Sequence, residues 1–252
     1  MTDQTPATLV PITIAILGGT GKEGAGLGFR WAHAGHRVIL GSREADRAVT
    51  AAADLTALLG GRATVEGADN ATAAAAATVV VLAVPFSAQQ ATALSVRDAL
   101  AGKILIDVTV PLVPPKVDRV QLPAGGSAVQ RLQDELGPQV RVVSAFQNVS
   151  AVHLKKIDNP IDCDVLVCGD DADAREQVVA LANAAGMVAW HAGVLANSAA
   201  AEALTSVLIA INKRYKVSSS GIRLTGVAPP GPPGVAPPGL TGVAPPGPPA
   251  GG

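Results

Sequence analysis

The sequence predicts an α/β protein: a Rossmann-type, doubly wound parallel sheet with a small C-terminal α/β lobe and a disordered Pro/Gly-rich tail. Strand-like apolar runs alternate with helix-like segments, an order that produces parallel strands with helices on both faces of the sheet. A glycine-rich turn follows the first apolar run. Near the end of the chain, GVAPPG recurs at 226, 234 and 242 in a stretch without charged or aromatic residues, which offers little to bury.

Local patterns justify the elements of the first half. The run at 12–17 is apolar, rich in β-branched residues and followed by glycines, as expected of a strand buried on both faces. Gly35 ends the next helix, and Gly60 with Gly61 ends the second. In chain order we expect a strand at 12–17, a helix at 22–34, a strand at 37–40, a helix at 44–59, strands at 63–67 and 78–84, a helix at 87–100 and a strand at 103–108.

The second half continues the alternation after a proline-rich loop at 111–123. We expect a helix at 126–136, strands at 140–146 and 162–169, a helix at 171–185, a strand at 187–193 and an apolar helix at 197–213. The predicted organisation is a flexible arm (1–11), a dinucleotide-binding domain (12–150), a small substrate lobe (151–225) and a disordered tail (226–252).

Composition excludes several classes of protein. The formal net charge is −1 with both signs mixed along the chain, so we expect neither nucleic-acid nor membrane binding. No signal peptide and no apolar run near 18 residues is evident, which predicts a cytoplasmic protein. Cys163 and Cys168 are expected to be reduced, partly buried and unable to share a metal ion. The apolar helix at 197–213 is a candidate interface of a homo-oligomer.

The glycine-rich turn has the spacing G-x-G-x-x-G at Gly19, Gly21 and Gly24. In this pattern the first glycine permits a tight turn, the second lets the backbone approach a pyrophosphate, and the third allows close packing of helix and strand. The helix that begins after the turn offers free N–H groups to phosphates. Because a strand precedes the turn and a helix follows it, we predict a dinucleotide site here.

The end of the second strand indicates which dinucleotide binds. An acid about 20 residues after the turn normally holds the ribose hydroxyls of NAD, but here the chain has Ser42 and Arg43, with Arg47 one helical turn later. A carboxylate would repel a 2′-phosphate, whereas a hydroxyl and guanidinium groups bind one. The sequence therefore predicts NADP.

No side chain is predicted to be catalytic, and no residue cluster has metal-ligand spacing. His33 and His36 are expected on the surface, and His191 is expected to be structural. His153 has two open interpretations: a loop residue or a ligand of a second substrate.

Several motifs together resemble the NADPH-dependent reductases of coenzyme F-420 (F420), an 8-hydroxy-5-deazaflavin. They are, in order, GGTGKEG, GSREADR, LAVPF, VVSAFQNVSA, VCGDD and LANS, and the resemblance runs from about 12 to 225. It implies an oxidoreductase that transfers a hydride between NADP(H) and coenzyme F-420 by stacking the two rings.

The resemblance also implies cofactor-binding positions. They comprise the turn, the 2′-phosphate residues, loops after two strands, a stretch along the nicotinamide, and one C-terminal position near the reacting rings. In that order, they are Gly19, Thr20, Gly21, Lys22, Glu23 and Gly24; Ser42, Arg43 and Arg47; Val84, Phe86 and Leu112; Val149, Ser150 and Ala151; and Ser220. Serine at 150 and at 220 departs from the proline and the apolar residue that the family favours.

Two alternatives remain open on the sequence. One is an NADP-dependent imine or hydroxyacid reductase, although such enzymes have an all-helical second domain where this chain shows two strand-like runs. The other is a non-catalytic NADP-binding interaction protein that uses the Pro-rich tail as a docking segment.

Overall fold

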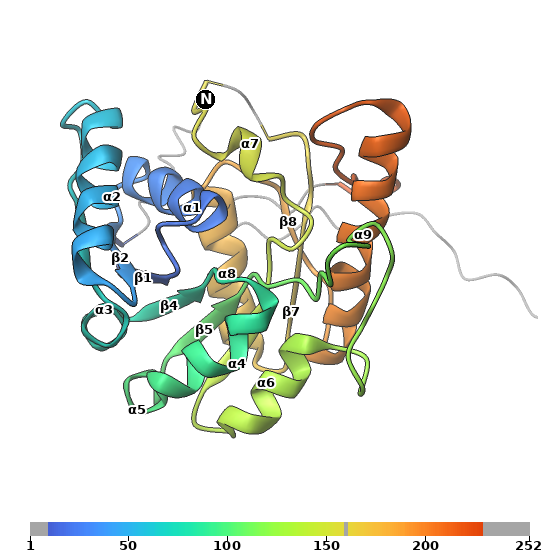
Figure 1. Cartoon of the computed structure of the whole chain (residues 1–252), viewed down its shortest axis with the longest axis horizontal. Coiled ribbons are helices and arrows are strands. Elements are labelled where there is room, and N and C mark those ends of the chain that lie inside the picture. Colours follow the sequence, from blue (N-terminus) through green and yellow to red (C-terminus); the bar gives the residue numbers. More distant parts are fainter. Residues whose placement is uncertain (1–9, 159–160, 229–252) are drawn as a thin grey trace, which may run out of the picture.

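The computed structural model describes residues 10–158 and 161–228. Eight strands form one sheet in the order β3-β2-β1-β4-β5-β6-β7-β8 (Figure 1). The first six strands are parallel, β7 runs antiparallel to β6, and β8 is parallel to β7. The predicted Rossmann-type sheet is confirmed, and the strands of the C-terminal lobe extend that sheet at its β6 edge.

The N-terminal half contains the five strands and five helices that surround the glycine-rich turn. Its elements are β1 (Thr13–Leu17), α1 (Lys22–His33), β2 (Arg37–Ser42), α2 (Ala45–Leu58), β3 (Val65–Asp69), α3 (Asn70–Ala76), β4 (Val79–Leu82), α4 (Phe86–Ser95), α5 (Arg97–Leu100) and β5 (Ile104–Asp107). The strands end at one edge of the sheet, where the loops after β1, β2, β4 and β5 meet. In parallel α/β sheets this edge is where ligands bind.

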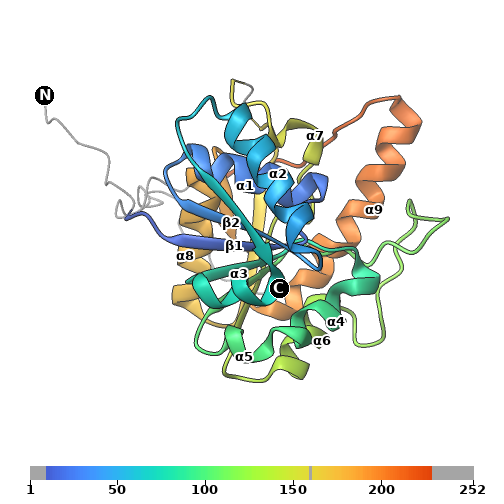
Figure 2. The ribbon, with the colours of Figure 1, turned by 60° about the vertical axis from the view of Figure 1, so that its left-hand side comes forward.

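The C-terminal half adds the last three strands and α9, which lies on the opposite side of the molecule from α2 in Figure 1; Figure 2 shows α4 and α5 below the sheet. Its elements are α6 (Ala128–Leu136), β6 (Arg141–Ser144), α7 (Ala151–Leu154), β7 (Val165–Gly169), α8 (Ala172–Ala184), β8 (Ala189–His191), a 3-10 turn (Leu195–Asn197) and α9 (Ser198–Tyr215).

Alternate residues of the strands face two separate cores. Ile14 and Ile16 of β1 pack with α1, α2 and α8, whereas Ala15 and Leu17 pack with α3, α4, α5 and α6. Period-two alternation in a strand gives this division, and covering both faces explains why the strands are apolar throughout. In the first core, Trp31 packs edge-on against Phe146, with ring centroids 5.8 Å apart.

Three helical features differ from the sequence-based expectation. The helix predicted at 87–100 is divided into α4 and α5 at Val96, whose φ is −120°. The short helices α3 and α7 were not expected, because runs this short carry no readable periodicity. In α3, the Asp69 side chain supplies the start signal by accepting a 2.9 Å hydrogen bond from the Thr72 amide.

Arg30 joins three segments behind the sheet. It lies buried on α1, and its guanidinium donates to the carbonyls of Leu154 and Ala185, each at 2.9 Å. The same group donates to the carbonyls of His153 and Lys156 at 3.2 and 3.0 Å. One side chain thus holds the α7 turn and the end of α8 against α1, although burial lowers the pKa of the guanidinium.

A buried acid ties α9 to α6. The Glu202 carboxylate accepts hydrogen bonds from the Ser127 hydroxyl at 2.6 Å and from the amides of Ala128 and Val129 at 2.8 and 3.2 Å. These amides belong to the first turn of α6, where free N–H groups need partners and a carboxylate is favourable. Ser127 and Ser198 share a further 2.6 Å hydrogen bond.

Two expectations need correction. His36 is buried rather than on the surface, because its Nδ1 accepts a 3.3 Å hydrogen bond from the Ile12 amide. Within the described residues one helix, Leu195–Tyr215, is long and apolar enough to cross a membrane by length and composition alone, contrary to the expected lack of such a run. The segments 1–9 and 229–252, which include most of the predicted arm and tail, lie outside the described residues.

Candidate functional site

Close packing within the β1–α1 turn explains two of its glycines. A Cβ on Gly19 would lie 2.8 Å from the Ile16 carbonyl oxygen, and one on Gly24 would lie 3.0 Å from the Gly19 Cα. Gly18, which precedes the motif, has a φ of +76°, and its Cβ would lie 2.6 Å from the Ala83 carbonyl oxygen. The turn can therefore fold in this way only with glycines at these positions.

Gly21 differs from its neighbours because its surroundings are open. It is the N-cap of α1 with φ −74°, and a Cβ there would meet one atom within 4 Å, the Gly18 oxygen at 3.3 Å. The absence of a side chain leaves the backbone accessible from outside, next to the first N–H groups of α1. This is the cradle that a pyrophosphate requires.

Gly21→Ala is expected to preserve the fold and to weaken NADPH binding about tenfold or more, because the methyl group occupies the space that the pyrophosphate needs. Alanine adopts this φ without strain, so only a modest loss of helix capping is expected. Calorimetric titration and thermal unfolding separate the two effects. Gly18→Ala is the contrasting control, expected to lower the melting temperature; an unchanged NADPH affinity of Gly21→Ala would contradict the role of the cradle.

On one side of the turn lies a basic cavity of about 420 Å³ at the ends of β1 and β2. Its lining includes Thr20, Ser42, Arg43, Glu44 and Arg47. The Arg47 Nη1 lies 3.5 Å from the Glu44 Oε1 in an exposed pair. Among the described residues Arg43 has no ion-pair partner, so its charge is available to an anionic ligand.

Asn70 and Glu44 are lining residues of this cavity that the sequence analysis did not select. The Asn70 Oδ1 is buried and has no hydrogen-bond partner within the described ranges, and a Cβ on Gly41 would lie 2.8 Å from it. A buried orphan acceptor of this kind fits a ligand hydroxyl or amino group. Asn70 directly follows the end of β3, and this position is the feature of the sequence that could have indicated a ligand-binding residue.

On the other side of the turn lies a larger, mostly apolar cleft of about 560 Å³. It shares Gly21, Ala83, Val84 and Pro85 with the basic cavity, so the two adjoin at the turn. The sequence-selected residues that line it, besides the shared Gly21 and Val84, are Lys22, Glu23, Phe86, Leu112 and Val149. An apolar slot beside a phosphate-binding turn suits a flat ring such as nicotinamide.

A buried polar network that the sequence analysis missed lies behind this cleft. The Asp107 carboxylate accepts from the Thr109 amide and hydroxyl at 2.8 and 2.6 Å, and from the Gln89 amide at 2.6 Å. Burial raises the pKa of Asp107 to about 6, while these hydrogen bonds oppose the shift. Thr109 and Gln147 reach the cleft wall, and the Gln147 amide donates to the Asp107 carbonyl at 2.8 Å. The network fixes the loop after β5 beside the cleft.

Ser150 and Ser220 lie together, but in a different cavity of about 310 Å³. There the His153 Nε2 lies 2.6 Å from the Ser219 hydroxyl, and Cys163 completes the wall. Burial raises the pKa of the Cys163 thiol. Ala151 begins α7 and lines none of the cavities described here.

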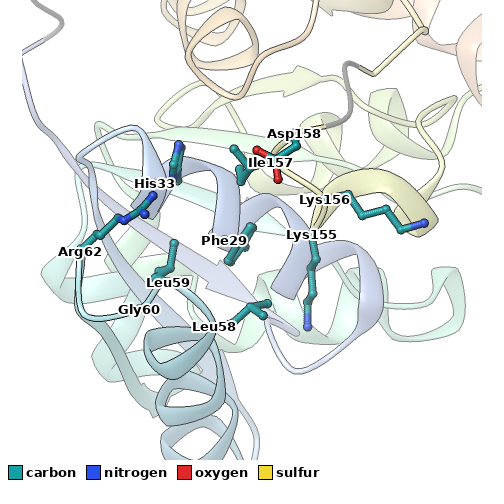
Figure 3. Close-up of a pocket in the computed structure, with 10 residues that line it drawn as sticks. All are labelled: Phe29, His33, Leu58, Leu59, Gly60, Arg62, Lys155, Lys156, Ile157 and Asp158. Carbon is teal, nitrogen blue, oxygen red and sulfur yellow. The ribbon is translucent and has the colours of Figure 1, made fainter.

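A further cavity of about 530 Å³ lies at the far ends of α1 and α2, away from the glycine-rich turn (Figure 3). Arg62 and Lys155 contribute positive groups, His33 contributes an imidazole, Asp158 contributes a carboxylate, and the Lys156 amine points away from the others (Figure 3). This cavity contains none of the residues selected from the sequence. Within the described ranges, no three His, Cys, Asp or Glu side chains gather as a metal site.

Known proteins are similar to this chain along most of its length. The family model described as "NADP oxidoreductase coenzyme F420-dependent" matches residues 13–111. The F420-dependent NADP reductase of Methanothermobacter thermautotrophicus is 43% identical over 220 residues, which is 85% of this chain and 95% of the relative. That of Methanocaldococcus jannaschii is 40% identical over 221 residues, covering 85% and 98% respectively.

Solved structures give the same result at the level of the fold. A protein assigned as an F420-dependent NADP reductase from Arthrobacter sp. FB24 superposes with a TM-score of 0.71 at 27% identity, covering 85% of this chain and 99% of that one. An imine reductase from Myxococcus stipitatus gives a TM-score of 0.54 at 16% identity, covering 82% of this chain but 62% of its own.

Proposed function

Because the chain belongs to the family of coenzyme F420-dependent NADP oxidoreductases, we propose that it transfers a hydride between NADP(H) and coenzyme F-420. The observation that carries this proposal is the pair of adjoining cavities at the glycine-rich turn. A cavity lined by the Arg43 guanidinium, which has no ion-pair partner in the described part of the chain, adjoins an apolar cleft across Gly21, and the cleft is large enough for a ring. NADP matches this arrangement, because it carries a 2′-phosphate on its adenosine end and a flat nicotinamide ring at the other end.

We assign the basic cavity to the 2′-phosphate half of NADP. Arg43 supplies a positive charge that no described residue pairs with, and Ser42 and Arg47 line the same cavity. Glu44 competes for Arg47 through their exposed pair, so Arg43 is the principal phosphate ligand in this proposal. Thr20 and Gly21, with the amides of the first turn of α1, take the pyrophosphate.

We assign the apolar cleft to the nicotinamide. Val84, Phe86, Leu112 and Val149 enclose the ring, and the Asp107 network holds the polar wall in place. When both are bound, NADPH and the deazaflavin supply the hydride chemistry themselves, and the chain's residues orient the rings and exclude water. No described residue needs to act as an acid or a base in this scheme.

We propose that the cavity around Ser150, His153 and Ser220 holds the polar edge of the deazaflavin. It lies next to the cleft in sequence, because Ser150 directly follows Val149. Hydroxyl and imidazole groups suit the polar edge of the deazaflavin, while Ala151 helps to position the start of α7.

The test is a reaction of the purified protein with NADPH and oxidised coenzyme F-420, in which the visible absorption of the deazaflavin is followed. Bleaching that depends on the protein and is far faster with NADPH than with NADH is the expected result. Removing 226–252 is expected to leave the rate unchanged. Turnover of a cyclic imine or a 2-keto acid, with no reaction of coenzyme F-420, would instead support the imine or hydroxyacid reductase alternative.

NADPH binding without turnover of any acceptor would support the non-catalytic alternative. The likeness to imine reductases shows the fold alone: the one from Myxococcus stipitatus is 16% identical, and this chain covers 62% of its length.

We further propose that the enzyme acts in the cytoplasm as a homo-oligomer without nucleic-acid or membrane partners. Val207, Ile211 and Tyr215 of α9 leave 44%, 37% and 71% of their surface exposed, and they form the candidate interface. Light scattering coupled to gel filtration measures the assembled mass, and a monomeric mass would contradict this interface.

A further inference from the structure

Glu23 is an acid whose charge is disfavoured by burial, although the start of a helix by itself favours a carboxylate. It is in the first turn of α1 and lines the apolar cleft rather than the basic cavity. Its Oε1 is shielded from solvent and has no hydrogen-bond partner among the described residues. A buried polar atom left without a partner in a ligand cleft indicates that the ligand supplies the partner.

The surroundings of Glu23 disfavour the carboxylate form. Burial raises its pKa to about 8, and no neighbouring charge or hydrogen bond contributes to that shift. Among the described residues, Lys22 is the only other ionisable side chain that lines the cleft. A bound pyrophosphate next to the turn would bring negative charge, which disfavours a carboxylate still further.

We infer that Glu23 contacts the nicotinamide half of the dinucleotide as a neutral carboxylic acid and donates a hydrogen bond to an oxygen of that half. This inference rests on the proposed function. The neutral acid has one O–H donor, and the oxygens of the pyrophosphate and of the carboxamide are both acceptors. The adenosine half is excluded as the partner because Glu23 does not line the basic cavity.

Binding and protonation are then linked. The complex favours the protonated acid, so NADPH affinity is fully present below the pKa of Glu23 and is lost as pH rises through it. With a pKa of about 8 in the free protein, the dissociation constant is expected to increase about tenfold between pH 7 and pH 9.

The experiment is calorimetric titration of the full chain with NADPH at several pH values across this interval. Wild type is expected to show the tenfold loss, and Glu23→Gln, which keeps a hydrogen-bond donor but cannot ionise, is expected to show none. 2′,5′-ADP, which lacks the nicotinamide half, should bind wild type and Glu23→Gln with the same pH profile. Asp54→Asn, an equal charge change at an exposed site on α2, should retain the wild-type profile.

A second measurement does not depend on any variant. Titration of wild type in buffers of different ionisation enthalpy is expected to reveal proton uptake with NADPH near pH 8.5, and none with 2′,5′-ADP. Tight NADPH binding without a pH slope or proton uptake would overturn the role of Glu23 alone, as would a wild-type slope retained in Glu23→Gln. Failure to bind NADPH at every pH would overturn the proposed function itself.

Discussion

Replacing Arg43 by alanine is expected to weaken NADPH binding about 30–100-fold and to leave NADH binding almost unchanged. A charge-assisted hydrogen bond contributes about 1.5–3 kcal/mol, and the phosphate can form two with one guanidinium. Arg43 has no ion pair in the described part of the chain, so its removal exposes no stranded partner and the fold should be unaffected. The loss is thus confined to the ligand that carries the 2′-phosphate.

The measurement is the ratio of NADPH to NADH dissociation constants for Arg43→Ala and for wild type. Arg62→Ala is the matched control, because Arg62 is also exposed but lies at the far end of α2. Arg47→Ala should give a smaller loss, since Arg47 already pairs with Glu44. Equal losses of NADPH and NADH affinity in Arg43→Ala would contradict the assignment of the basic cavity.

The largest effect on stability is expected at Arg30. Among the described residues, Arg30→Ala removes the donors to the backbone carbonyls of His153, Leu154, Lys156 and Ala185. A buried acceptor left without a donor costs about 1–3 kcal/mol, and partial hydration of the opened space reduces the sum. We expect the free energy of unfolding to fall by about 4 kcal/mol, near the upper end for a single substitution.

Urea unfolding followed by circular dichroism measures this change. Arg30→Lys retains a positive charge and some of the donors, so it should recover part of the loss, whereas Arg62→Ala should lie within about 0.5 kcal/mol of wild type. If the free energy of unfolding of Arg30→Ala lay within about 1 kcal/mol of the wild-type value, the carbonyls would have found other donors. Because α7 begins just after Val149, the NADPH affinity of Arg30→Ala should also fall.

Much of the fold was predictable because its signals are local. Each strand buried on both faces is a continuous apolar run, and glycines end the helices α1 and α2. The glycine-rich turn and the missing acid at Ser42 could be read for the same reason, since their chemistry depends on a few consecutive residues. The antiparallel pairing of β7 with β6 depends on contacts between distant segments, and the sequence pattern did not contain it.

The sequence predicts those parts of the site whose residues come from one loop. It does not predict the parts whose residues come from several elements. The orphan oxygen of Asn70 and the network of Asp107 with Gln89 become visible only once separate elements pack together. Ser150 and Ser220 were selected by resemblance, and the structure brings them to one cavity beside His153 rather than into the apolar cleft.

The contact between Glu202 and the first turn of α6 limits how the protein can be divided. Thr205, one helical turn beyond Glu202, lines the apolar cleft and donates a 2.7 Å hydrogen bond to the Gln147 carbonyl. A fragment that ends before Ser198 would keep the glycine-rich turn. It would lose the Glu202 carboxylate that binds the first amides of α6, and it would lose Thr205 from the cleft wall. The nucleotide-binding half therefore cannot be transferred to another protein as a complete cofactor site. Without α9 it would keep the phosphate site but lack part of the wall of the cleft that holds the ring.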